Sequence, residues 1–321
     1  MMNEKIDYTA VVRTLGTAGE KYQKLLNSLI LQTVKPKDII VYIAEGYPLP
    51  KETVGVERYV YVKKGMVAQR SLPYTEVETE YMLFLDDDVY LSPNSVEILY
   101  RQLKSNDANV ISPDVFPNSK RSFKNEIMMT LSGRMRARRN DEKWGYKVMR
   151  NAGYSYNANP IKNVYFSQTN AGPCFFCTKK DFLDIHFEEE LWMDRLGYAL
   201  GDDQVMFYKM YKKGMKVLTS YNSGIEHLDA GTTIKSKDKE KTLIYADFRF
   251  KTIFWHRFIF LPETALILKL WDVLCLGYAF TFTLLISILK GDFDILKLKW
   301  SAIKNGISFL KSTEYKSLSR I

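Results

Sequence analysis

A short apolar run at residues 81–85 ends in three consecutive carboxylates, Asp86, Asp87 and Asp88. The run predicts a buried strand of a parallel sheet, and ligands of open α/β sheets bind at the carboxyl ends of such strands. Adjacent carboxylates repel one another unless a positive charge lies among them. A cation such as Mg²⁺ or Mn²⁺ takes oxygen ligands and leaves room for substrate phosphates. The motif favours a metal site over the simpler alternative, an acidic turn that caps the next helix at Ser92-Pro93.

A second acid pair, Asp202 and Asp203, stands in the stretch GDDQ and opens an apolar-faced segment that stops at Gly214. The helix macrodipole favours negative charge at this N-terminus, which accounts for one acid, and the second acid indicates a chemical task. Further on, His227 stands two residues before Asp229. A single histidine is more often an ordinary core or surface residue than a metal ligand.

The elements that would position these residues alternate between strands and helices. Strands are predicted at 8–13, 38–43, 59–62, 81–85, 109–112, 165–178, 216–220 and 224–228. Helices are predicted at 22–30, from about 66 to 73, at 92–104, after 179 and after 202. Such alternation is typical of βαβ units around a parallel sheet, so the fold class is α/β.

Between residues 118 and 160 the periodicity fades and basic residues are interleaved with aromatic ones, including Arg136, Arg138, Arg139 and Trp144. Such a mixture could bind single-stranded nucleic acid, or cover a phosphate-bearing substrate as a loop, or form a solvated face. We favour a loop or a solvated face, because no groove-entering motif accompanies the run.

These pieces, in this order, resemble the family 2 glycosyltransferases of the GT-A fold from about residue 8 to residue 227, and more loosely beyond. The stretch LFLDDDV resembles the DxD motif of that family, GDDQ its general-base motif, and IEH its late metal-binding histidine. The resemblance implies a Rossmann-like, mostly parallel sheet with flanking helices. It also implies a nucleotide-sugar-binding and catalytic domain at residues 1–240, followed by a helical tail at 241–321.

The resemblance assigns roles to the acids. Asp88 would bind Mn²⁺ or Mg²⁺ directly, Asp86 would bind the metal through water or the donor ribose, and His227 would complete the metal shell. Asp203, with Asp202 beside it, would be the general base that deprotonates an acceptor hydroxyl. One displacement by that hydroxyl would invert the anomeric configuration, unlike the paired carboxyls of a glycosidase.

The nucleotide-sugar side would be lined by residues from several strand ends: Arg13, Thr14, Glu45, Arg70, Asp86 and Asp87. Glu45 stands where the family usually has an aspartate that meets the base. Arg70 stands where the family often has an arginine toward the donor, and a surface arginine on a helix is its alternative.

The chain has 321 residues, 46% of them hydrophobic, and a formal net charge of +9. The charge favours anionic partners such as nucleotide phosphates, lipid head groups or nucleic acid. Cys174 and Cys177 form a CxxC without a second pair, so we expect buried thiols and no zinc site. The N-terminal stretch is not expected to be a signal peptide, because its apolar run is short and follows Asp7.

The C-terminal part mixes aromatic and basic residues and contains an uncharged apolar run at 273–289. At 17 residues this run is at the lower limit for crossing a bilayer. Helices in the surface of an anionic membrane, one marginal span, a helix packed on the sheet domain and a homodimer contact are the alternatives. Family members with similar tails glycosylate lipid-linked acceptors, so the resemblance favours membrane association.

We therefore expect a bacterial-type, metal-dependent, inverting glycosyltransferase of the hexosyltransferase type. It would act at the cytoplasmic face of the plasma membrane on a glycan or lipid-linked acceptor in cell-surface polysaccharide synthesis. No nucleic-acid partner is expected. The alternatives are a nucleotidyltransferase, which would need a second metal-binding acid, and a non-catalytic basic module that binds membrane or nucleic acid through charge.

Overall fold

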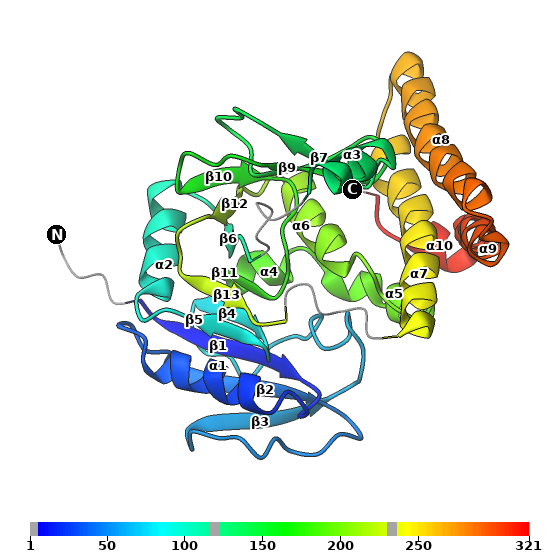
Figure 1. The fold of residues 1–321 in the computed structure, drawn as a ribbon. Helices are drawn as coiled ribbons and strands as arrows, with labels where there is room; N and C mark the ends of the chain where they lie inside the picture. The colour runs from blue at the N-terminus through cyan, green and yellow to red at the C-terminus, as the bar shows by residue number, and fades with distance from the viewer. Residues whose placement is uncertain (1–5, 116–121, 230–235, 321) are drawn as a thin grey trace.

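The computed structural model describes residues 6–115, 122–229 and 236–320. Its centre is an eight-stranded sheet with a layer of helices on each face (Figure 1). In spatial order the strands are β10 (Val164–Ser167), β12 (Val217–Ser220), β6 (Val110–Pro113), β11 (Cys174–Thr178), β4 (Tyr81–Asp86), β1 (Tyr8–Thr14), β2 (Asp38–Ala44) and β3 (Glu57–Val62). Within the described residues, all pairs except those of β10 and β11 are parallel, so the predicted mostly parallel α/β sheet is confirmed.

The central strands are apolar on both faces because helices cover both sides of them. Strands β1, β2 and β4 are buried along almost their whole length. Helices α1 (Glu20–Ile30) and α2 (Ser95–Ser105) pack on one face. Helices α4 (Lys179–Leu183) and α6 (Asp202–Lys212) pack on the other. The two buried cysteines of β11 point to opposite faces, Cys177 with α4 and α6 and Cys174 with α1 and α2, and the expectation of buried free thiols is confirmed.

The carboxyl ends of the parallel strands meet at one edge of the sheet. Arg13 of β1 pairs in register with Asp86 of β4, so Thr14 and Asp87 come next to each other at that edge. The reversed strand β11, which pairs with β4, begins there, and the carbonyl of Pro173 accepts a hydrogen bond from the Asp86 backbone N–H at 2.8 Å. A short antiparallel pair, β5 (Val89–Leu91) and β13 (Ile225–His227), extends the same edge and brings His227 back to the acidic turn.

Three local predictions are wrong. The strand predicted at 165–178 is two strands, β10 and β11, which β12 and β6 separate in the sheet. Residues 66–70 form turns and no helix, because Gly65 and Pro73 bound a segment too short to continue. The Asp194 carboxylate accepts from the backbone N–H groups of Val67 and Ala68 at 3.1 and 2.8 Å. The helix predicted at 92–104 begins at Ser95, after Asn94, which makes no side-chain capping bond. The alternative in which Ser92-Pro93 caps this helix is therefore not supported.

The basic and aromatic region holds more structure than its sequence predicts. Helix α3 (Phe123–Leu131) precedes a small sheet of order β7 (Met135–Arg138), β9 (Tyr154–Asn157) and β8 (Tyr146–Val148). Each strand has only three or four residues, which is too few for a period-two pattern to be recognised. Residues 118–121 of this region lie outside the described residues.

The C-terminal tail is helical, as expected, and packs at one side of the molecule (Figure 1). It comprises α7 (Lys237–Trp255), a π-helical turn (His256–Phe260), α8 (Leu266–Leu289), α9 (Phe293–Leu310) and α10 (Thr313–Ser317). A 3₁₀ turn (Phe187–Leu191) and α5 (Trp192–Arg195) connect α4 to the loop before α6. Phe254, Phe309 and Tyr315 belong to the same core as Phe207 of α6. The tail therefore shares its core with the sheet, and the domain boundary at residue 240 stays a prediction.

Candidate active site

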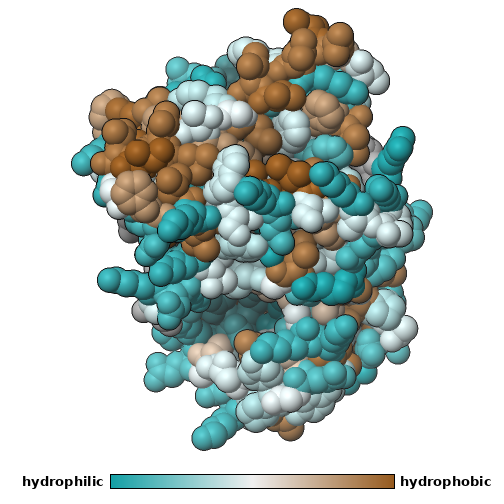
Figure 2. Space-filling model, turned by 90° about the vertical axis from the view of Figure 1, so that its right-hand side faces the viewer, coloured by the Kyte–Doolittle hydropathy of each residue, from teal (hydrophilic) through white to brown (hydrophobic). Residues whose placement is uncertain are grey.

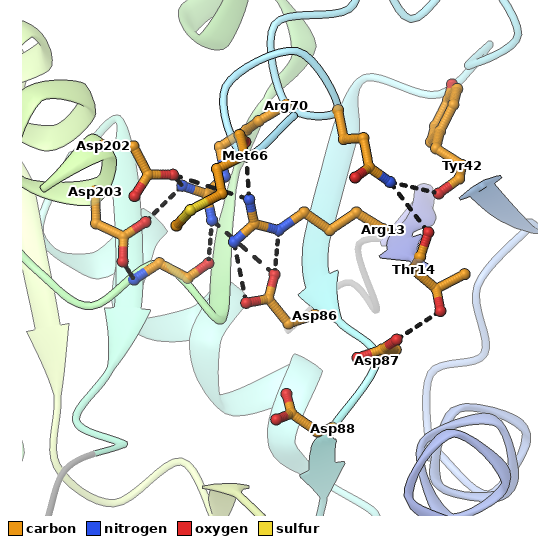
Figure 3. Close-up of polar contacts among 12 residues, drawn as sticks. Arg13, Thr14, Tyr42, Met66, Arg70, Asp86, Asp87, Asp88, Asp202 and Asp203 are labelled. Atoms are coloured by element: carbon orange, nitrogen blue, oxygen red, sulfur yellow. Dashed lines mark hydrogen bonds and ion pairs between the residues drawn. The ribbon is translucent and has the colours of Figure 1, made fainter. Parts of the chain in front are cut away.

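The three acids at the end of β4 have three different partners, of which Figure 3 shows those of Asp86 and Asp87. Asp86, still in the strand, forms a two-pronged ion pair with Arg13, in which Nη2 lies 3.0 Å from Oδ2. Asp87 accepts a hydrogen bond from the Thr14 hydroxyl at 2.5 Å. Asp88 lies 3.0 Å from Nε2 of His227, measured from Oδ2. The triplet is thus split into one acid with a fixed counter-charge, one hydrogen-bonded acid and one acid beside an imidazole.

These partners set the charge of each group. Burial alone would raise the pKa of Asp86, but the Arg13 guanidinium outweighs it and holds that pKa below its usual value. Burial raises the pKa of Asp87 to about 6, with the neighbouring carboxylates adding to the rise and the Thr14 hydrogen bond opposing it. Burial would lower the pKa of His227, yet the Asp88 hydrogen bond and charge bring it above the ordinary value. The edge therefore concentrates negative charge that favours a cation.

Asp88 and His227 are the residues that fit a divalent cation. The β5–β13 pairing holds them together, and the Leu228 N–H donates to the Asp88 carbonyl at 2.8 Å. Their side chains are only 15% and 16% exposed, so the oxygen and nitrogen are sheltered but reachable. Across the described residues no three His, Cys, Asp or Glu side chains come together as a metal cluster. A one-carboxylate, one-imidazole pair suits a metal whose remaining ligands are waters and substrate phosphates.

A second network joins the acids of α6 to the strand ends. Arg70 is only 2% exposed, and its Nη1 lies 2.9 Å from Asp202 Oδ2 and 2.5 Å from Asp203 Oδ1. Its Nη2 donates to the Gly172 carbonyl at 3.1 Å and lies 4.0 Å from Asp86 Oδ1. Arg70 therefore connects the base motif to the acidic triplet, and the alternative of an exposed surface arginine on a helix is wrong.

The two acids of GDDQ have different surroundings. Asp202 is 4% exposed, and burial together with the charge of Asp203 raises its pKa to about 7, against the opposing guanidiniums of Arg70 and Arg13. The Asp203 side chain is 32% exposed, and the Gly172 N–H donates to its Oδ2 at 3.0 Å. Only Asp203 thus combines a fixed orientation with access from solvent, which are the requirements of a general base.

The predicted nucleotide-sugar residues occupy the same edge in different ways. Arg13 and Thr14 end β1 and bind the acids of the triplet. Glu45 follows β2 directly and is exposed. Arg70 is buried on the acids of α6. Their contacts with a donor, and the metal contact of Asp86, stay predictions.

Three residues of this network were missed by the sequence interpretation. Gln69 donates to the Thr14 and Tyr42 carbonyls at 3.1 and 3.4 Å, which fixes the turn that carries Arg70. Gln204 donates to the Ala152 carbonyl at 3.0 Å and anchors the start of α6 to the small sheet. Gly172 contacts both Arg70 and Asp203, and its signal was the Gly-Pro step in front of an apolar strand.

The chain can be compared with curated proteins, solved structures and family models. No curated protein matches the chain. Among solved structures, the mannosyltransferase PcManGT from Pyrobaculum calidifontis, in complex with GDP-Man and Mn²⁺, is similar at 12% identity and a TM-score of 0.47 over 97% of this chain and 82% of that one. Residues 58–160, which include the acidic triplet and the small sheet, match the model of glycosyl transferase family 2. Over residues 58–160, the predicted resemblance to the family 2 glycosyltransferases is thereby confirmed.

Proposed function

We propose that the protein is a metal-dependent, inverting glycosyltransferase that moves a hexosyl group from a nucleotide-sugar to a hydroxyl of an acceptor. One observation supports this most directly. A cation-favouring pair, Asp88 and His227, lies at the same sheet edge as an oriented, solvent-accessible carboxylate, Asp203. Arg70 connects Asp203 to Asp86 of the triplet, and Asp86 is paired with Arg13. A nucleotidyltransferase would have no task for Asp203.

The roles proposed for the residues that would bind the donor follow from their charges. A divalent cation held by Asp88 and His227 would act as a Lewis acid that stabilises the charge on the departing diphosphate. Asp86 keeps a low pKa beside Arg13 and would remain ionised toward the metal-bound water or the ribose. Glu45 and Thr14, at the ends of β2 and β1, would meet the nucleoside.

The proposed activation of the acceptor hydroxyl depends on Asp203. Its carboxylate, oriented by the Gly172 N–H and by Arg70, would take the proton of the attacking hydroxyl as the new glycosidic bond forms and the bond to the diphosphate breaks. Asp202 would not touch substrate, because it is buried behind Arg70. A single displacement of this kind inverts the anomeric centre.

We further infer the acceptor class from the rest of the chain. The +9 net charge and the amphipathic tail favour an anionic, lipid-linked or glycan acceptor at a membrane surface, as in the synthesis of cell-surface polysaccharide. The basic segment from Arg136 to Lys143 surrounds an open hollow of about 500 Å³ and would face such an acceptor. The cytoplasmic face of the plasma membrane is the location that a nucleotide-sugar donor favours.

A thermal-shift screen tests the proposal. UDP, GDP, CMP and dTDP are each added with and without Mn²⁺, and one of them is expected to raise the melting temperature only together with the metal. At one hundred times the dissociation constant the stabilisation is about 2.7 kcal/mol. If no nucleotide shifts the melting temperature under either condition, the donor assignment is wrong.

A further inference from the structure

Helix α8 presents two different faces. The face toward the protein carries the buried residues of the helix, Asp272, Leu276, Ala279 and Ser287. The opposite side carries large apolar residues that are between 37% and 81% exposed: Leu266, Ile267, Leu268, Leu270, Trp271, Val273, Leu274, Tyr278, Leu285, Ile288 and Leu289. Figure 2 shows hydrophobic side chains gathered in the upper half of this side of the molecule, above a hydrophilic lower half. A continuous apolar surface of this kind indicates a partner that covers it.

Helix α9 adds charge beside this surface. Phe293, Trp300 and Ile307 are exposed at intervals of seven residues. Exposed lysines follow each of them by four residues, at Lys297, Lys304 and Lys311. A shift of four residues is a rotation of roughly 40° on an α-helix, so the lysine row runs along the edge of the apolar row. The Lys304 ammonium lies 5.6 Å from the centre of the Trp300 ring.

Apolar rows bordered by lysines match the boundary between acyl chains and anionic head groups. We propose that α8 and α9 lie in the plane of one leaflet of an anionic bilayer and that α8 does not cross it. Aromatic and aliphatic side chains would enter the acyl region, while the lysine row contacts lipid phosphates. This inference does not depend on the proposed glycosyl transfer.

Length alone would allow α8 to span, since 24 residues of helix reach about 36 Å. The packing opposes a span. Asp272, in the first third of α8, is fully buried and lies 2.7 Å from the Arg150 guanidinium of the loop between β8 and β9. Toward the other end, the Lys299 ammonium donates to the Thr283 carbonyl and the Ser287 hydroxyl, both at 2.9 Å. Crossing the bilayer would bring these charges into hydrocarbon, where charged groups are costly.

Vesicle co-sedimentation of the full chain tests the surface. We expect binding to vesicles of phosphatidylcholine with phosphatidylglycerol and much weaker binding to phosphatidylcholine alone. The triple change Lys297→Glu, Lys304→Glu and Lys311→Glu should weaken binding to the anionic vesicles at least a hundredfold, because each lysine at an anionic surface contributes about fivefold. Equal binding of this variant and the wild type overturns the proposal.

A matched control carries the same change of charge elsewhere. Lys24, Lys35 and Lys180 are exposed on the sheet domain and are also changed to glutamate. This variant should bind anionic vesicles as tightly as the wild type. If it loses as much binding as the Lys297, Lys304 and Lys311 variant, only the net charge of the protein matters and the proposal is overturned. Point changes are preferable to deleting residues 262–321, because Phe309 and Tyr315 belong to the main core.

The side of the membrane on which the two ends of α8 lie tests the in-plane arrangement. Thr264→Cys and Lys290→Cys flank α8, and each is placed in a Cys275→Ser background, since Cys174 and Cys177 are fully buried. In sealed vesicles from expressing cells, a membrane-impermeant maleimide should label both positions from the side on which Lys24→Cys is labelled. Labelling of only one flank from that side shows a span and overturns the proposal. A stable dimer in solution that does not bind vesicles assigns the surface to a second copy and overturns it as well.

Discussion

Replacing Gly172 by alanine tests how the general base is oriented. A Cβ atom at this position would lie 2.0 Å from Asp203 Oδ1 and 2.5 Å from its Cγ, and 2.9 Å from Arg70 Nη2. The backbone of Gly172 is not in the left-handed region, so alanine adds no backbone strain there. The consequence of the change is the pressure of one methyl group on the Asp203 carboxylate and, less strongly, on the Arg70 guanidinium.

The displacement can be converted into a rate. To restore an ordinary van der Waals distance the Asp203 oxygen must move by about 1.4 Å, and a misplacement of about 1 Å in a reacting pair already costs about a hundredfold. The move also breaks the 3.0 Å bond from the Gly172 N–H, a loss of about 1.5–3 kcal/mol of stability for a hydrogen bond to a charged group. We therefore expect kcat to fall about a hundredfold and donor affinity to be unchanged.

The assay is release of nucleoside diphosphate at saturating donor and acceptor, with donor affinity measured by calorimetry and folding by thermal denaturation. Gly277→Ala is the matched control, because a Cβ atom added there would have nothing within 4 Å and the residue stands in the middle of α8. The control should retain the wild-type kcat. A Gly172→Ala enzyme with undiminished kcat would refute the role of the Gly172 contact in orienting Asp203.

Three further predictions concern charges at the sheet edge. Asp88→Ala should abolish the Mn²⁺-dependent rise in melting temperature seen with nucleotide, and a persisting rise would reassign the metal. At pH 8, where Asp202 is ionised, Arg70→Met should lower the free energy of unfolding by about 3–5 kcal/mol, because it leaves the buried carboxylate without its nearest counter-charge; a denaturant titration at this pH that shows a loss below 1 kcal/mol would contradict this. The pKa of Asp202 is raised to about 7 by burial, so the native protein holds a proton there that the unfolded chain releases above about pH 4. Wild-type stability relative to Asp202→Asn should therefore fall by about 2 kcal/mol as the pH rises from 5 to 7, and a pH-independent difference in denaturation would reject the shift.

The sheet was predictable because most of its strands can be recognised from their own residues. Residues 39–43 and 81–85 are uninterrupted apolar runs, which fully buried parallel strands require, and the strands predicted at 38–43 and 81–85 both formed within one residue of each predicted limit. The same holds for α6, whose start at Asp202 and stop before Gly214 are marked by polar and glycine residues. The small sheet was missed because β7, β8 and β9 are too short to show a period.

The types of residue at the site could be predicted from the sequence, whereas the contacts between their side chains could not. The acids and His227 were named because carboxylates at strand ends are conspicuous in a sequence. Arg13 binds Asp86 although the two residues are 73 positions apart in the sequence. Arg70 binds both acids of α6, which are more than 130 positions away. Only the fold brings these side chains within about 3 Å of each other. No local pattern contains that information. Gly172 acts through its lack of a side chain, which a sequence reader sees only as one glycine among seventeen.

The most direct test of the account is the behaviour of Asp203→Asn toward a nucleotide-sugar donor identified in the thermal-shift screen. Asparagine keeps the shape of the side chain and its bond to Gly172 but cannot accept the proton of the acceptor hydroxyl. We predict donor binding by calorimetry within a few-fold of the wild type and no detectable transfer to acceptor. Transfer at the wild-type rate would contradict the assignment of Asp203 as the base and, with it, the proposed mechanism.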